Sequence, residues 1–154
     1  MTHPGEAMLK ERFRVVVPIQ VRFRDLDAMG HVNNAVYLTY LEMGRLAYYR
    51  ELMGLSHPKD FNFILAHVSI DFRSPVVLGE TVYVGVRVTR VGKKSFHFEY
   101  ELREATTGRL VAEATSVQVM YDYARQTTVP VAPEFRKRLE AFEGRSFDEE
   151  VPPG

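Results

Sequence analysis

A polar loop spanning residues 24–34 holds the side chains of this sequence that are best suited to chemistry. Its polar residues include two carboxylates, one imidazole and two carboxamides, at Asp25, Asp27, His31, Asn33 and Asn34. Apolar residues alternate before this loop and recur at helical spacing after it. Because the first N–H groups of a helix have no partner within the helix, a loop that ends there can bring side chains and free backbone donors to one point. We therefore expect the chemistry of the chain in this loop.

The elements that must position the loop are predicted from the same apolar spacing. Residues Phe13–Phe23 alternate with a period of two, which is typical of a half-buried strand, and Pro18 on the opposite face suits an edge position or a bulge. A broad apolar stripe predicts a helix at about Ala35–Met53, with Asn33 or Asn34 as its N-cap. A helix that is apolar over so much of its surface is usually buried by more than one neighbour.

The rest of the chain indicates further strands. Alternating apolar residues predict four of them, at about 64–72, 82–88, 96–102 and 110–121. Turn sequences at 92–94 and 105–108 predict hairpins, and small residues in the last strand would let a helix approach closely. One long helix followed by successive hairpins predicts an α+β fold, in which an antiparallel sheet of five or slightly more strands packs against that helix. A short helix is predicted at 133–142.

Length and composition limit the possible classes of protein. The 154 residues fit one domain, which we expect at residues 10–142, between a disordered N-terminus at 1–9 and a flexible tail at 143–154. A net charge of zero argues against general binding of nucleic acid. We expect no membrane span and no signal peptide, and the absence of cysteine favours a cytoplasmic protein. Histidines at irregular spacing predict no metal site.

Three segments of the sequence, in order and correctly spaced, resemble a known family. They are residues 24–37 at the loop and helix start, residues 68–75 in the second strand, and residues 92–96 at a hairpin. Together they resemble the hotdog-fold acyl-CoA thioesterases of the 4-hydroxybenzoyl-CoA thioesterase-like family. The resemblance implies a strongly curved antiparallel sheet wrapped around one long central helix. It also implies homodimers that join two sheets edge to edge, often as tetramers, with active sites at the subunit interface.

The resemblance implies hydrolysis of an acyl-CoA thioester, with CoA as part of the substrate and no separate cofactor. The family's catalytic acid corresponds to Asp27, three residues before the loop glycine, acting as general base or nucleophile. Its backbone oxyanion donor corresponds to Asn34 at the helix start, and His31 is a candidate to orient water or to bond Asp27. Thioester hydrolysis needs an activated water or a covalent nucleophile, and donors for the charge that grows on the carbonyl oxygen.

A basic hairpin is the predicted contact for the rest of the substrate. Lys93, Lys94 and Ser95 resemble the hairpin that meets the CoA phosphates in this family. Basic side chains in a turn suit an exposed anion contact, although a solvated hairpin has the same pattern.

Several of the polar residues also fit structural roles. Asp27 could cap a turn, and the two asparagines of the loop could cap the helix. Asp25 could brace the loop or pair with Arg24. Glu42 is a rival base, since some hotdog thioesterases use a helix glutamate, but a pair with Arg45 favours a structural role.

Other functions are compatible with the same fold. A hotdog protein can bind acyl-CoA as a non-catalytic sensor, and other hotdog enzymes hydrate or dehydrate acyl thioesters. The loop also resembles the Asp-x-Asn-x-His-Val-Asn-Asn run of plant thioesterases that act on acyl-ACP, in which a catalytic asparagine corresponds to Met29. Because methionine cannot do the work of that asparagine, acyl-CoA is the favoured substrate over acyl-ACP.

Overall fold

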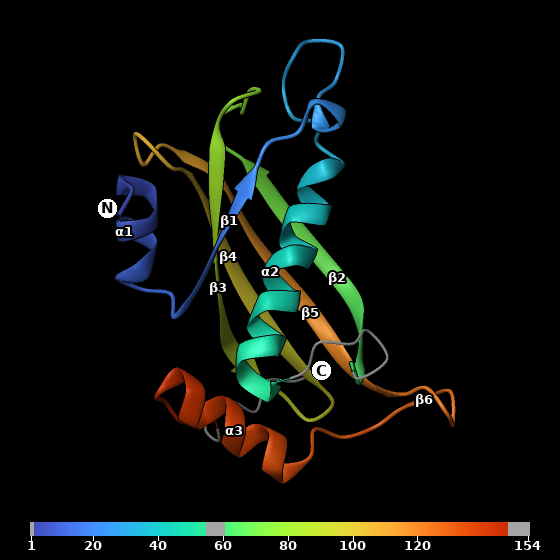
Figure 1. Cartoon of the computed structure of the whole chain (residues 1–154). Helices are drawn as coiled ribbons and strands as arrows, with labels where there is room; N and C mark the ends of the chain where they lie inside the picture. The colour runs from blue at the N-terminus through green and yellow to red at the C-terminus, as the bar shows by residue number, and fades with distance from the viewer. Residues whose placement is uncertain (1, 55–60, 148–154) are drawn as a thin grey trace.

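The fold is an antiparallel sheet curled around one long helix (Figure 1). The computed structural model describes residues 2–54 and 61–147. In chain order its elements are α1 (Pro4–Lys10), β1 (Val15–Gln20), the 3-10 helix η1 (Phe23–Asp25), α2 (Val36–Met53), β2 (Phe63–Phe72), β3 (Thr81–Val91), β4 (Ser95–Glu104), β5 (Leu110–Asp122), β6 (Thr127–Thr128) and α3 (Pro133–Glu143). The strand order is β1-β3-β4-β5-β2, and β6 pairs with β5. The predicted α+β class, with hairpins after the long helix, is confirmed.

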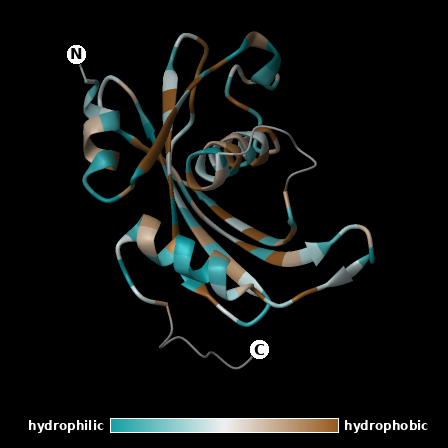
Figure 2. Ribbon diagram, turned by 60° about the horizontal axis from the view of Figure 1, so that its bottom comes forward, coloured by the Kyte–Doolittle hydropathy of each residue, from teal (hydrophilic) through white to brown (hydrophobic). Residues whose placement is uncertain are grey.

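Helix α2 lies in the concave side of the sheet, where its apolar surface is buried on several sides (Figure 2). Gly44 permits a close approach to β3, because a Cβ atom there would lie 2.7 Å from Cγ2 of Val86. The small residues that were predicted to help such packing are buried in β5, at Ala112, Ala114 and Ser116. Although α2 is largely buried, neither it nor any other described helix is long and apolar enough to cross a membrane.

The N-terminal segment forms helix α1 against the sheet from Pro4, so the predicted disorder is wrong for residues 4–9. Leu9 of α1 is fully buried and packs with Phe13 in a small second core on the side of the sheet away from α2. The N–H group of Gly5 donates to the carbonyl oxygen of Ala105 over 2.9 Å. The segment has too few apolar residues to show a periodic pattern, and one buried leucine fixes it instead.

Both elements that flank the polar loop are shorter than predicted. Strand β1 ends at Gln20, because the chain then turns into η1 and leaves Phe23 80% exposed. Helix α2 begins one residue later than predicted, and its N-cap is Ala35 instead of an asparagine. The side-chain oxygen of Asn33 accepts a hydrogen bond from the N–H group of Ala35 over 2.9 Å, which closes a turn ahead of the helix.

Helix α3 lies across the lower end of the sheet in Figure 1, where the sequence predicts a short helix. Its residues Phe135 and Leu139 join the main core. The packed chain continues past the predicted boundary at residue 142: Phe147 is fully buried, and its N–H group donates to Oε2 of Glu140 over 2.8 Å. The rest of the predicted flexible tail, residues 148–154, lies outside the described residues.

The two edge strands of the sheet differ. Strand β1 is short and carries Pro18, whose edge position is confirmed. Strand β2 is ten residues long, contains no proline and leaves most of its side chains exposed. Within residues 2–54 and 61–147 it pairs only with β5, so its other edge carries unpaired backbone groups.

The close fit of α2 against β3 gives a testable prediction. We expect Gly44→Ala to lower the free energy of unfolding by about 1–2 kcal/mol, because overpacking outweighs the helix propensity that alanine adds. Urea unfolding measures the change. Thr39→Ala on the exposed side of α2 is the control and should be neutral or slightly stabilising. A Gly44→Ala protein more stable than the wild type would contradict the predicted clash.

Candidate functional site

The polar loop, the first turn of α2 and the end of β2 surround one pocket. It has a volume of about 250 Å³ and is lined by Asp27, His31, Val32, Asn34, Tyr37, Phe72, Arg73, Ser74 and Pro75. The structure therefore brings together three of the predicted site residues, Asp27, His31 and Asn34.

Asp27 caps the turn of the loop and also faces the pocket. Its Oδ1 accepts hydrogen bonds from the N–H groups of Met29 and His31, over 2.9 and 3.3 Å. Its own N–H group donates to the carbonyl oxygen of His31 over 2.7 Å. In the part of the chain that the structure describes, Oδ2 has no hydrogen-bond partner. One carboxylate oxygen is thus fixed by the backbone while the other can act as a base or a nucleophile.

Asn34 lies just ahead of the first turn of α2. The N–H groups of Val36 and Tyr37 donate to the carbonyl oxygens of Asn33 and Asn34, over 2.9 and 3.3 Å. The N–H group of Asn34 itself donates to no atom among the described residues. It lies at the positive end of the helix dipole, where a negative charge is stabilised.

Asp25 holds the loop to the helix from inside the protein. Its carboxylate is buried and accepts hydrogen bonds from the side chain and the N–H group of Arg22 and, over 2.8 Å, from the hydroxyl of Tyr40. Its carbonyl oxygen accepts from the N–H group of Asn33 over 2.9 Å. The prediction that Asp25 braces the loop is confirmed, but its ion-pair partner is Arg22 and not Arg24.

These contacts also determine the charge of Asp25. Burial by itself would raise the pKa of its carboxyl group. The hydrogen bonds from Arg22 and Tyr40 and the charge of Arg22 together outweigh burial, so the pKa lies below its ordinary value. Asp25 is therefore ionised at neutral pH and serves the structure of the loop.

An ion pair fixes the opposite wall of the pocket. Arg109 of the β4–β5 connection binds Glu80 over 3.1 Å and donates to Oγ of Ser74 and the carbonyl oxygen of Pro75, both over 3.0 Å. The N–H group of Val32 donates to the carbonyl oxygen of Val76 over 2.9 Å and joins this wall to the loop. The residues of this network are far apart in the sequence, so no local pattern identifies it.

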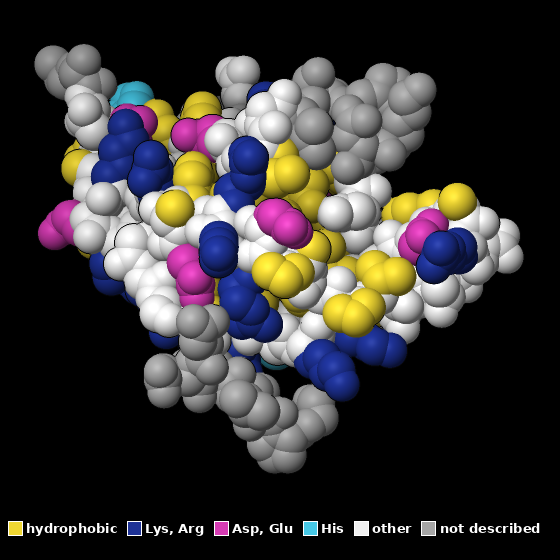
Figure 3. Space-filling model, turned by 90° about the horizontal axis from the view of Figure 1, so that it is seen from below, with side chains coloured by type: hydrophobic (Ala, Val, Ile, Leu, Met, Phe, Trp, Pro, Cys, Tyr) yellow, Lys and Arg dark blue, Asp and Glu magenta, His cyan; other side chains and the backbone are white. Residues whose placement is uncertain are grey.

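The predicted CoA-binding hairpin is not part of this pocket. Lys93 and Lys94 lie in the β3–β4 turn at the lower end of the sheet, beside α3, whereas the pocket adjoins the other end of β3 (Figure 1). The two ends of the strand are roughly 30 Å apart at the usual rise per residue. The end of the molecule that holds the hairpin presents many Lys and Arg side chains (Figure 3).

The predicted pair between Glu42 and Arg45 is not formed. Arg45 is buried and donates to the hydroxyl of Tyr100 over 3.1 Å, and Glu42 is exposed. Both line a second pocket of about 190 Å³ between α2 and β2, apart from Asp27. The ion pair that favoured a structural role for Glu42 is therefore absent, and Arg45 is held by Tyr100 instead.

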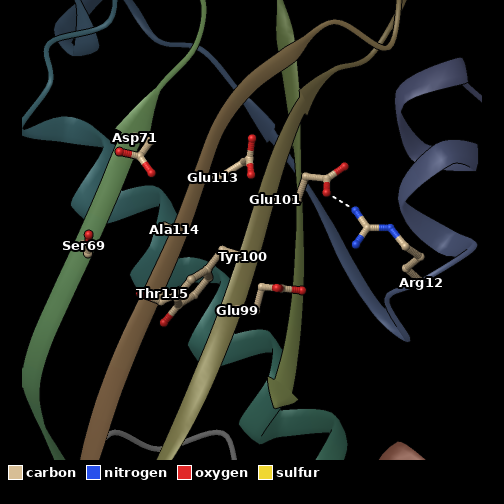
Figure 4. A pocket seen from close by; sticks show the side chains of 9 residues that line it. All are labelled: Arg12, Ser69, Asp71, Glu99, Tyr100, Glu101, Glu113, Ala114 and Thr115. Carbon is tan, nitrogen blue, oxygen red and sulfur yellow. Dashed lines mark hydrogen bonds and ion pairs between the residues drawn. The ribbon is translucent and has the colours of Figure 1, made fainter. Parts of the chain in front are cut away.

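A third pocket, of about 200 Å³, lies on the outer face of the sheet, away from α2 (Figure 4). It is lined mainly by polar side chains of β2, β4 and β5. Its carboxylates form ion pairs that join Glu101 to Arg12 and Arg103, Glu99 to Arg87, and Asp71 and Glu113 to Arg73. Because these charges are balanced, the pocket around Asp27 is the better candidate for chemistry.

Comparison with known proteins finds relatives that are named as thioesterases or acyl-CoA hydrolases. A model of the thioesterase-like superfamily matches residues 21–139. A thioesterase of Thermus thermophilus, crystallised with coenzyme A and Zn, is 36% identical and has a TM-score of 0.78, and the match covers 88% of this chain and 98% of that one. The long-chain acyl-CoA thioesterase FadM of Escherichia coli is 29% identical over 130 residues, 79% of this chain and 94% of FadM. The 1,4-dihydroxy-2-naphthoyl-CoA hydrolase of Synechocystis is 27% identical over 119 residues, 73% of this chain and 84% of that protein.

The role of Asp25 can be tested through stability. We expect Asp25→Asn to lower the free energy of unfolding near neutral pH by about 2 kcal/mol, because it removes a buried charge-assisted contact. The low pKa in the folded protein means that the carboxylate stabilises the fold above its ordinary pKa of 3.8 and that this contribution is lost as the pH falls below that value.

The difference between wild type and Asp25→Asn should therefore shrink in acid. Urea unfolding near neutral pH and below pH 3.8 measures it. Asp71→Asn, at an exposed carboxylate of β2, is the control and should change stability little. A difference that stays constant across this range would contradict the assigned role.

Proposed function

Because this chain belongs to the thioesterase-like superfamily and is a thioester hydrolase, we propose that it hydrolyses an acyl-CoA to a carboxylic acid and CoA in the pocket around Asp27. The observation that carries the proposal is that Oδ2 of Asp27 and the N–H group of Asn34 both lack a partner among the described residues and belong to residues that line the same pocket. The relatives that are named for acyl-CoA hydrolysis support CoA as the carrier. CoA is part of the substrate, and we propose no further cofactor.

The thioester carbonyl oxygen would accept a hydrogen bond from the N–H group of Asn34, at the positive end of α2. On one route, Oδ2 of Asp27 takes a proton from water while the water oxygen attacks the carbonyl carbon. On the other, Oδ2 attacks that carbon itself and forms a mixed anhydride, and water then attacks Cγ of Asp27, which releases the carboxylic acid and restores the Asp27 carboxylate. On the first route the C–S bond breaks as the CoA sulfur takes the proton that Asp27 removed from water. On the second route the C–S bond breaks as the anhydride forms, and the CoA thiolate takes its proton from water.

His31 has a supporting role in this proposal. Its backbone fixes Oδ1 of Asp27, and its side chain lines the pocket. An imidazole at this position can orient the attacking water beside the carboxylate.

The CoA-binding hairpin requires a second copy of the chain. Pairing of the free β2 edge with the β2 edge of another copy about a two-fold axis makes these strands antiparallel. The Phe72 end of one β2, beside the pocket, then adjoins the Phe63 end of the other. Lys94 lies near the Phe63 end of β2. Its carbonyl oxygen accepts a hydrogen bond from the N–H group of Met120, and Met120 is the residue of β5 that pairs with Phe63. We therefore propose a homodimer in which Lys93, Lys94 and Ser95 of the second copy bind the CoA phosphates.

The catalytic assignment is tested with Asp27→Asn. We expect kcat for acyl-CoA hydrolysis to fall by roughly 100- to 10,000-fold, because the amide is neither a base nor a nucleophile. The amide oxygen can still accept from Met29 and His31, so stability should change little. Release of free thiol from a panel of acyl-CoAs and acyl-ACPs measures activity. Undiminished turnover would exclude Asp27 from catalysis, and acyl-CoA binding without thiol release by the wild type would identify a sensor.

A single turnover in isotopically labelled water separates the two routes. Heavy oxygen in Asp27 after one turnover, found by mass spectrometry of the peptide, would identify the nucleophilic route.

Subunit mixing tests the shared site. Asp27→Asn and the double variant Lys93→Ala/Lys94→Ala should each be weakly active at low acyl-CoA concentration. If each site takes Asp27 from one copy and the lysines from the other, mixed dimers contain one intact site. Random exchange should then restore roughly a quarter of wild-type activity. No recovery, with dimer exchange shown by mass, would contradict the shared site.

A further inference from the structure

Tyr37 is the unusual tyrosine of α2. Four tyrosines of this helix are buried, and three of them have hydroxyl groups that donate to a side chain outside the helix, at Asp25, Glu143 and Asn62. Tyr37 is only 3% exposed and lines the pocket around Asp27. Across residues 2–54 and 61–147, its hydroxyl has no hydrogen-bond partner. Because Tyr37 lines the pocket and its hydroxyl has no partner among the described residues, this O–H group is available to donate to a molecule bound there.

The position of Tyr37 points to what that partner is. Tyr37 follows Asn34 by three residues, so both lie on one side of the helix start. Side chains on a helix lean towards its N-terminus, which brings the Tyr37 ring back over the turn that contains Asn34. The ring packs edge-on against Tyr40 and Phe72, with centroids 5.8 and 5.2 Å away, so the hydroxyl is held in place before substrate arrives.

The surroundings keep this hydroxyl protonated. Burial raises the pKa of Tyr37, the charge of Glu80 raises it further, and Arg109 opposes them without reversing the shift. Arg109 is itself engaged by Glu80, Ser74 and Pro75. Tyr37 is therefore a neutral donor over the working range of an enzyme.

We propose that the Tyr37 hydroxyl donates a hydrogen bond to the thioester carbonyl oxygen, as a second donor beside the N–H group of Asn34. The inference rests on the proposed function, since it assigns one more residue to the same site. A fixed donor aimed at this oxygen stabilises the transition state more than the ground state, because negative charge grows there during the reaction. Tyr37 is then a catalytic residue.

The test is Tyr37→Phe, which removes only the oxygen atom. We expect kcat to fall by about 10- to 100-fold while KM changes little, because the lost contact strengthens in the transition state. The loss should be the same for a short and a long acyl-CoA, since both carry the same carbonyl. The midpoint of urea unfolding should not fall, because the hydroxyl has no partner within the described residues.

Tyr83→Phe is the matched control. Tyr83 is 8% exposed and packs with Leu9 and Phe13 on the other side of the sheet, away from the pocket. Removal of the Tyr83 hydroxyl should leave both kcat and the midpoint of urea unfolding unchanged.

Each other outcome has a defined meaning. An unchanged kcat for Tyr37→Phe, a rise in KM alone, or a fall in the unfolding midpoint that accounts for the lost activity would overturn the role of Tyr37. If the role of Tyr37 is overturned but Asp27→Asn is inactive in the same assays, the proposed function still stands. A wild type that releases no thiol from any acyl-CoA would overturn both proposals.

Discussion

The buried carboxylate of Asp25 is the constraint on which the site depends. A carboxylate inside a protein is costly unless its oxygens are hydrogen-bonded, so the chain must close around it. Arg22 supplies contacts from before the loop, and Tyr40 supplies one from the second turn of α2. The same residue accepts the N–H group of Asn33 through its carbonyl oxygen. Both ends of the loop are therefore fixed to one point, and Asp27 lies between them.

The rest of the fold makes the helix a fixed reference for this loop. Gly44 brings α2 so close to β3 that one more methyl group has no room. The second wall of the pocket is fixed independently by Arg109 and Glu80. The groups proposed to contact a substrate do not hold these elements together. The exception is Oδ1 of Asp27, which closes the turn of the loop. Such a division lets the reactive side chains be positioned before substrate arrives.

The parts that the sequence predicts well are those with local causes. The long helix and the hairpins follow from apolar periodicity and turn residues, and Asp27, His31 and Asn34 meet because they are near in sequence. The partners that depend on tertiary structure are not predictable in this way. Arg109 and Glu80 are 29 residues apart, and Tyr40 reaches Asp25 across 15 residues. Helix α1 cannot be predicted from apolar periodicity, because the burial of the single residue Leu9 fixes its position.

The unequal edges of the sheet bear on the size of the proposed assembly. Pro18 has no N–H group to donate at β1, whereas β2 is longer, contains no proline and has one bulge, between Leu65 and His67. A sheet with two receptive edges can add copies without end and grow into a fibre. Residues 2–54 and 61–147 offer one such edge, so pairing of two copies through β2 would leave neither copy a second edge of this kind, and the proposed homodimer would not grow further.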